Sequence, residues 1–191
     1  MAPVAAAAGH LAGVTASLEI GNLVPGSASS LVPPGFKPTT YLCVEYKGMA
    51  VELGNLFRAR DCKLAPTIRF APEACSQKGA SAKTYYTLML VDPESPTPGR
   101  FCRHWVLPGL QPIDDIDGTV TQTRPASTEY LGPRNESQPH RYLFLLFREP
   151  EDLSLGHDDA SDTRQFDAAG FIAKHGLELI GVNWMLGLGD G

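Results

Sequence analysis

The sequence contains no run of eighteen apolar residues, so we expect no helix that crosses a membrane. It also lacks an excess of basic residues, since 16 Lys+Arg against 21 Asp+Glu give a formal net charge of -5. The basic residues are scattered, and the charged footprint of a nucleic-acid-binding protein is missing. Because 43% of the residues are hydrophobic and 19% are charged, wholesale disorder is excluded as well, and we expect a soluble globular protein.

Motifs for serine hydrolysis, paired-cysteine sites and secretion are also missing. No G-x-S-x-G elbow occurs, and no two cysteines have C-x-x-C spacing. The stretch 1–8 is apolar but carries no Lys or Arg, and Gly9-His10 interrupts it, which is untypical of a secretory signal. We therefore expect a cytoplasmic protein whose scattered thiols are buried small hydrophobes: Cys43, Cys62, Cys75 and Cys102.

Glycine and proline, by contrast, are abundant, with 19 and 16 residues. This composition favours turns and short strands over long helices, and it predicts a mainly β fold of the β-rich α+β kind. A chain of 191 residues can bury one sizeable core. We expect a single domain over 1–191, with an N-terminal helical segment over 1–25 and the core over 26–191. No internal repeat is visible.

Local patterns predict most of the elements. They indicate a helix through Leu11, Val14 and Leu18, a hairpin at Lys47-Gly48, and central strands over 84–91 and 141–147. They also indicate a helix that Asp167 caps, that runs to about Lys174 and that stops at Gly176, and a closing strand over 177–186. A shorter strand over 105–107 is expected to end at the turn dipeptide Pro108-Gly109. The acidic stretch 149–162 is expected to be solvent-exposed.

Three ends of predicted strands carry residues suited to chemistry. Asp92 follows an apolar strand directly, where a carboxylate needs a partner because its burial is costly. His104 opens the short strand, and His140 opens the second apolar strand. Each of them alone is also explained as a turn residue or as a histidine at a strand edge. As a group they are more informative than any member.

The neighbourhood of His104 leaves two further kinds of chemistry open. Residues two apart on a strand share a face, so Cys102 and His104 should point together, away from Arg103 and Trp105. A thiolate–imidazole pair is one hypothesis, and a metal triad of His104 with His140 and Asp92 is another.

Three motifs, in their order and separations, resemble the phosphatidylethanolamine-binding protein family, also called the Raf kinase inhibitor protein family. They are V-D-P-E-S-P at 91–96, R-H-W-V at 103–106, and Y-L-G-P at 130–133 followed by H-R-Y-L-F-L-L-F at 140–147. Supporting resemblance extends over 35–56, 65–68 and 166–176. The likeness therefore covers nearly the whole chain after the N-terminal segment.

The resemblance implies a large central antiparallel sheet, a smaller sheet, peripheral helices and an anion pocket at one edge. By motif, the ligand-binding residues would be Asp92, Pro96, His104, Gly132, His140 and Tyr142. Imidazoles and loop N–H groups can donate to a phosphate or carboxylate, while the aspartate orients an imidazole. The resemblance implies lipid headgroups or other small anions as ligands, and no metal or other cofactor.

The loop between Gly132 and His140 departs from the family pattern, because it is shorter and lacks Pro-Pro. Arg134 in this loop could hold a second anionic group of the ligand, and we expect it with Cys102 at the rim of the pocket. The Ser95-Pro96 bond, in the first motif, could adopt the cis form.

Two classes of function follow from the resemblance. The first is a non-catalytic binding protein with a regulatory or inhibitory role, whose partner is a protease or a kinase. The second is an enzyme or accessory protein of fungal secondary-metabolite biosynthesis, which assists cyclisation or dimerisation of polyketide-derived anhydrides of the maleidride type beside a biosynthetic enzyme. There, His104, His140 and Asp92 would orient a carboxylated substrate and move one proton. The shortened polar loop favours this second class.

Overall fold

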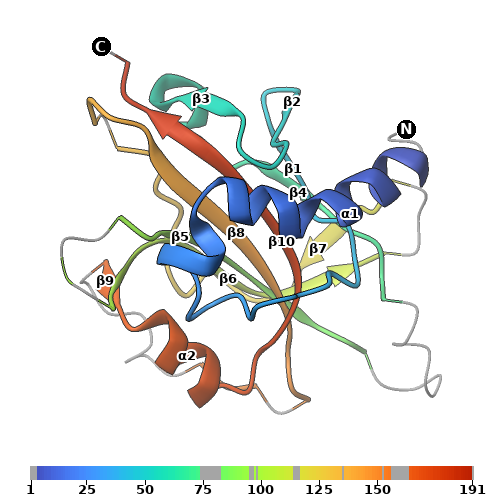
Figure 1. Ribbon diagram of the computed structural model, residues 1–191. Helices are drawn as coiled ribbons and strands as arrows, with labels where there is room; N and C mark the ends of the chain where they lie inside the picture. The colour runs from blue at the N-terminus through green and yellow to red at the C-terminus, as the bar shows by residue number, and fades with distance from the viewer. Residues whose placement is uncertain are drawn as a thin grey trace.

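Two β-sheets form the centre of the computed structural model, which describes residues 4–73, 83–94, 97, 99–113, 117–134, 136–151, 153–155 and 164–190 (Figure 1). The large sheet has the order β3-β10-β8-β5-β6-β7, and its pairs are antiparallel except for the parallel pair of β3 and β10. Its strands are β3 (Leu56–Arg58), β5 (Tyr86–Asp92), β6 (Phe101–Pro112), β7 (Val120–Gln122), β8 (His140–Arg148) and β10 (Glu178–Leu188). The short strand β9 (Gln165–Phe166) pairs with β6.

The smaller sheet has the order β2-β1-β4, with all pairs antiparallel. It consists of β1 (Cys43–Tyr46), β2 (Met49–Ala50) and β4 (Thr67–Arg69). The predicted hairpin at Lys47-Gly48 is present, with φ of 49° and 83°, as a two-residue turn with positive φ at both positions requires. The mainly β fold with a large sheet, a smaller sheet and peripheral helices is thereby confirmed.

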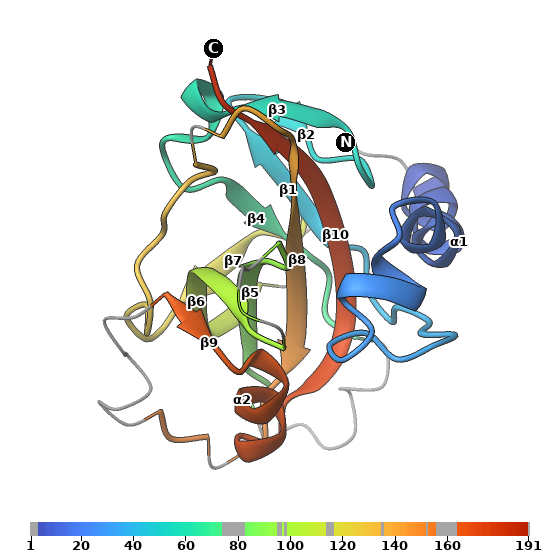
Figure 2. The same ribbon diagram turned by 60° about the vertical axis from the view of Figure 1, so that its left-hand side comes forward.

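Alternation along the central strands gives the large sheet two apolar faces. In β8, Leu143 and Leu145 belong to one buried cluster, whereas Tyr142 and Phe144 belong to the other. The first cluster is covered by the N-terminal helix and the late helix, and the second by the small sheet. Figure 2 shows the N-terminal helix α1 and the small sheet on opposite sides of β8 and β10. Both faces of the central strands are covered, as the continuous apolar runs predict.

Helices lie at the periphery of the sheets, where the sequence places them. They are α1 (Val4–Ile20), the irregular turn Leu23–Ser27, the 3-10 turn Ala59–Cys62, and α2 (Ala168–Lys174). The Asp167 carboxylate accepts from the backbone N–H of Gly170 at 2.9 Å and so caps α2. Gly176, at φ 59°, follows the other end of α2. No helix among the described residues is long and apolar enough to span a membrane.

The prediction that a short strand ends at Pro108-Gly109 is wrong, because β6 continues to Pro112. Gly109 takes φ 74°, and the register against β5 shifts between Tyr86 and Leu88. The turn dipeptide is thus absorbed as a β-bulge inside a longer strand. Pairing of β6 with the strands on both of its sides, β5 and β7, outweighs the local turn preference.

The expectation that the stretch from Glu149 is solvent-exposed is also wrong at its first residue, whose side chain is only 2% exposed. The Glu149 carboxylate accepts from the Thr87 hydroxyl at 2.7 Å and from the Gly109 N–H at 2.8 Å. It also pairs with the Arg124 guanidinium. A buried carboxylate needs such partners, and here they fix the bulge of β6 to the end of β8.

Asn183, buried in β10, connects the large sheet to the chain segments that precede β1 and follow β2. Its amide nitrogen donates to the carbonyls of Leu42 at 3.1 Å and Val51 at 2.9 Å. Its amide oxygen accepts from the N–H groups of Leu53 at 3.2 Å and Trp184 at 2.8 Å. All four hydrogen-bonding positions of the side chain are therefore used.

Candidate functional site

The end of β5 and the start of β8 lie side by side and bring Asp92 to His140. The Asp92 side chain is 3% exposed, and its Oδ2 lies 2.9 Å from Nδ1 of His140, which is 23% exposed. The other carboxylate oxygen, Oδ1, accepts from the N–H of Glu94 at 2.7 Å. A carboxylate bound to Nδ1 keeps a proton there, so Asp92 directs the Nε2 edge of His140 away from itself.

His104 occupies a β-bulge in β6. Leu90 pairs with Trp105 and Val91 pairs with Arg103, so His104 is the additional residue between them. Its ring meets the Tyr142 ring edge-on, with centroids 5.0 Å apart. The bulge therefore turns a fully buried imidazole toward the start of β8.

The predicted facing of the residues beside His104 is only partly right. Arg103 lies over the Phe166 ring, at 5.1 Å from its centroid, in the cluster under α2. Trp105, expected on that same face, packs instead in the opposite cluster and meets Tyr130 edge-on. The bulge shifts the alternation by one residue, which a strict period of two cannot anticipate.

The two nitrogens of His104 have different surroundings. Nδ1 lies 2.8 Å from the carbonyl oxygen of Leu131 and therefore donates its proton to it. Nε2 is buried and has no hydrogen-bond partner among the described residues. Burial lowers the pKa of His104, against smaller raising effects of the Leu131 carbonyl and Asp92, while Arg134 and Arg164 lower it further. The free imidazole is then neutral near pH 7, and Nε2 presents a lone pair.

The loop before β8 closes around Tyr142. The N–H of Arg134 donates to the buried Tyr142 hydroxyl at 3.2 Å, and the N–H of Leu131 donates to the His104 carbonyl at 2.8 Å. Between them, Gly132 passes so close to Cys62 that an added Cβ would overlap the Cys62 carbonyl oxygen. Glycine is needed here for close backbone approach, not for its φ. Burial raises the pKa of Tyr142, so its hydroxyl stays protonated at neutral pH.

Cys102 contacts an arginine, and no hydrogen bond joins it to His104 among the described residues. The Arg134 guanidinium Nη2 lies 3.2 Å from the Cys102 Sγ. Burial raises the pKa of the Cys102 thiol, although Arg134 opposes this. A thiol with a raised pKa is a poor nucleophile at neutral pH, which argues against the thiolate–imidazole hypothesis.

Glu94 and Arg141 form an ion pair that the sequence did not indicate as part of the site. The Arg141 N–H donates to Glu94 Oε2 at 2.9 Å, and the guanidinium pairs with Oε1. The same guanidinium donates to the carbonyls of Gly21 and Asn22, at 2.7 and 3.0 Å, directly after the end of α1. Burial raises the pKa of Glu94, and so does its hydrogen bond with Asp92, while Arg141 lowers it.

Asp92, Glu94 and His140 are the described residues whose ligand atoms could hold a metal ion, since they lie within 4.8 Å of one another. This set differs from the hypothesised triad, because Glu94 takes the place of His104. Both Glu94 oxygens already accept from Arg141, and Asp92 already accepts from His140. A cation would have to displace these contacts.

Most predicted site residues therefore meet in one place, and we call Asp92, His104, His140 and Tyr142 the histidine cluster. Gly132, Arg134 and Cys102 border it through the contacts above. Pro96, the Ser95-Pro96 bond and Cys75 lie outside the described residues. The sequence did not single out Leu131, whose carbonyl fixes the tautomer of His104, because a backbone contact leaves no pattern in side-chain identity.

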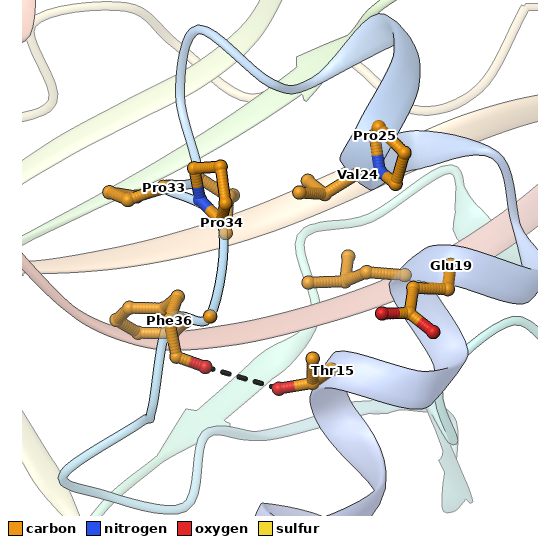
Figure 3. Close-up of a pocket in the computed structure, with 10 residues that line it drawn as sticks. Thr15, Glu19, Val24, Pro25, Pro33, Pro34 and Phe36 are labelled. Carbon is orange, nitrogen blue, oxygen red and sulfur yellow. Dashed lines mark hydrogen bonds between the residues drawn. The ribbon is translucent and has the colours of Figure 1, made fainter.

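A separate apolar hollow of about 200 Å³ lies between α1 and the loop that follows it (Figure 3). Thr15 and Glu19 of α1 face Pro33, Pro34 and Phe36 there, and the Thr15 hydroxyl donates to the Phe36 carbonyl at 3.1 Å. Among the residues that the structure describes, no member of the predicted site lines it.

The chain is similar in sequence to known proteins of one family. The sequence model of the family described as phosphatidylethanolamine-binding protein matches residues 47–184. The chain is 25% identical over 162 residues to Protein MOTHER of FT and TFL1 homolog 2 of Oryza sativa subsp. japonica, which covers 82% of this chain and 86% of that protein. It is 28% identical over 144 residues to the carboxypeptidase Y inhibitor of Saccharomyces cerevisiae, covering 61% of this chain and 65% of the inhibitor.

Solved structures share the fold. A carboxypeptidase Y inhibitor complexed with its cognate proteinase has a TM-score of 0.73 at 19% identity, covering 94% of this chain and 97% of that one. A phosphatidylethanolamine-binding protein from Plasmodium vivax has a TM-score of 0.66 at 18% identity, covering 93% and 98%.

Proposed function

Because the chain belongs to the phosphatidylethanolamine-binding protein family, we propose that it binds a small phosphate- or carboxylate-bearing ligand at the histidine cluster and regulates or inhibits a protein partner. The observation that supports this most strongly is the buried Nε2 of His104, which has no partner among the described residues. Buried polar atoms are nearly always hydrogen-bonded, and an orphan at a β-bulge favours a ligand as the missing partner.

The groups around the orphan nitrogen can bind an anionic ligand in either of two protonation states. His104 binds an anionic oxygen once Nε2 is protonated, or it accepts from a ligand O–H while it is neutral. His140 lies beside it with Nδ1 held by Asp92 at 2.9 Å, which leaves its Nε2 edge for contact with a ligand. Tyr142 supplies a protonated hydroxyl beside them.

A relative in complex with another protein supports the proposal of a protein partner. A carboxypeptidase Y inhibitor shares the fold, and its structure is a complex with its cognate proteinase. We propose that this chain likewise acts on a partner protein, and that binding of the ligand controls this action. The second candidate, a biosynthetic enzyme or accessory protein, is favoured by the arginine that the short loop places beside the cluster.

Isothermal titration calorimetry of the full chain tests the ligand proposal. The probes are inorganic phosphate, glycerophosphoethanolamine and citrate, each with wild type and with His104→Ala. We expect phosphate-bearing probes to bind wild type and to lose at least about tenfold in affinity in His104→Ala, because a charge-assisted hydrogen bond is removed.

His175→Ala is the matched control, since it removes an imidazole at the end of α2 that belongs to a different part of the fold. Binding that survives in His104→Ala contradicts the assignment of the ligand to this cluster. Binding of citrate alone, lost in His104→Ala, supports the biosynthetic candidate instead of a headgroup-binding regulator.

A further inference from the structure

Three arginine side chains line one open groove next to the histidine cluster. The groove has a volume of about 550 Å³ and is lined by Thr97, Arg100, Arg134, Arg164 and Gln165. The arginines come from three segments: the loop before β6, the loop before β8, and the residue before β9. Like charges that converge on one surface repel each other, so this arrangement is unfavourable until a negative group offsets it.

No carboxylate within the described part of the chain neutralises these three guanidiniums. None of them takes part in an ion pair there, and no acidic residue among those described lines the groove. Arg124 and Arg141, by contrast, each pair with a carboxylate. In a chain where acidic residues outnumber basic ones, 21 against 16, the groove stands out as a local concentration of positive charge.

Uncharged partners hold two of the guanidiniums in place. Arg134 donates to the Cys102 Sγ at 3.2 Å. Arg164 donates from Nη1 to the carbonyls of Arg103, His104 and Glu129, at 3.3, 3.4 and 3.2 Å. These contacts orient the groups without cancelling their charge, and the remaining nitrogens keep their donor capacity.

Two of the groove arginines contact residues of the histidine cluster. Arg164 binds the backbone of the bulge that carries His104, and Arg134 binds Tyr142 through its N–H. Burial is the main cause of the lowered pKa of His104, and the Coulombic effects of Arg134 and Arg164 add to it. The two arginines are thus close enough to act electrostatically on the proposed binding imidazole.

We propose that this groove is a second anionic subsite, so that the ligand carries two anionic groups. One group lies at the histidine cluster, and the other is bound by Arg100, Arg134 and Arg164. The guanidinium geometry suits a phosphate or a carboxylate, both of which accept two parallel hydrogen bonds. The inference rests on the proposed function, because the first group must occupy the histidine cluster.

Titration calorimetry with matched one-group and two-group probes tests this. The pairs are methylphosphonate with propane-1,3-bisphosphonate, and butyrate with glutarate. We expect the two-group member of at least one pair to bind wild type about tenfold more tightly or better than its one-group analogue, because a second set of charge-assisted contacts forms. The pair that shows the advantage tells phosphate from carboxylate ligands.

Arg100→Gln should reduce this advantage to about threefold or less, because the second anionic group loses one of the guanidiniums that line the groove. The double variant Arg100→Gln/Arg134→Gln should abolish the advantage. Lys37→Gln makes the same charge change at an exposed position on another part of the surface and should behave as wild type.

Equal affinities for both members of each pair would overturn the second subsite, and so would an advantage that survives in the double variant. A two-group probe that binds His104→Ala as tightly as wild type would also overturn it, because the groove would then act alone. Failure of every one-group probe to bind wild type would instead refute the histidine cluster as an anion site.

Discussion

Binding of an anion should transfer a proton to His104, so affinity should fall as the pH rises. In the free protein the pKa of His104 lies below its ordinary value of about 6.5, mainly because of burial. The Nδ1–H group of His104 donates to the Leu131 carbonyl, and Nε2 carries no proton while the ring is neutral. Nε2 can therefore donate to an anion only after the ring takes up a second proton. A bound negative charge stabilises the imidazolium and raises the pKa of His104 in the complex.

The magnitude follows from linkage between proton and anion. Between the pKa of free His104 and its higher pKa in the complex, each pH unit should weaken binding about tenfold, or by about 1.4 kcal/mol. The charged groups that act on His104 are Asp92, which favours the imidazolium, and Arg134 and Arg164, which oppose it. In the free protein, the lowered pKa of His104 makes the free energy of unfolding depend on pH. This free energy should fall as the pH drops below about 6.5, because the unfolded chain takes up the proton at a higher pH than the folded one.

The assay is titration calorimetry with dimethyl phosphate, which keeps a single negative charge from about pH 5 to 8. Measurements near pH 7.5 in two buffers of different ionisation enthalpy give the number of protons taken up, which we expect to be greater than zero for wild type. His104→Gln should bind more weakly and lose the pH dependence, whereas His140→Gln should keep it. An affinity of wild type that stays constant from about pH 6.5 to 8 would refute this reasoning, as would an unchanged slope in His104→Gln.

Three further variants test the packing that supports the site, with urea unfolding as the common measurement. Gly132→Ala should lower stability by about 1–3 kcal/mol and weaken anion binding, because the new methyl group overlaps the Cys62 carbonyl. Gly13→Ala is its control: the nearest atom lies 3.5 Å away, so a change beyond about 1 kcal/mol would contradict the clash argument. Asn183→Ala should cost about 3–5 kcal/mol, since four backbone groups, three of them in buried hydrogen bonds, lose their partner, and a loss below about 1 kcal/mol would show that water replaces the amide. Glu149→Ala should cost about 3 kcal/mol by leaving a guanidinium and a buried N–H unpaired, and unchanged unfolding would show that this network adds nothing.

Features set by neighbouring residues could be predicted from the sequence. The apolar run of β8 predicts a strand buried on both faces, and Asp167 predicts the start of α2, because both signals are local. The Pro108-Gly109 turn signal is local too, but pairing of β6 with the strands on both of its sides overrides it. The same cause limits the facing of Trp105, which depends on a bulge that only the register against β5 defines.

The site shows the same division. Family motifs led to Asp92 and His140, and the structure places their side chains 2.9 Å apart. Arg100 and Arg164 belong to no motif, and they meet in one groove only because β9 returns to pair with β6. Convergence of like charges from distant segments is a property of the folded chain and leaves no spacing in the sequence.

The parallel neighbours β3 and β10 also bear on how the chain folds during synthesis. The Arg58 guanidinium at the end of β3 bonds to the carbonyl of Gly189, 131 residues later. On the ribosome, β3 therefore emerges long before its partner, and β8 waits with one edge unpaired until β10 follows. Contacts so distant in sequence close slowly. The open edge of β8 is thus a surface of the nascent chain alone, where chaperones that bind unpaired apolar strands would act.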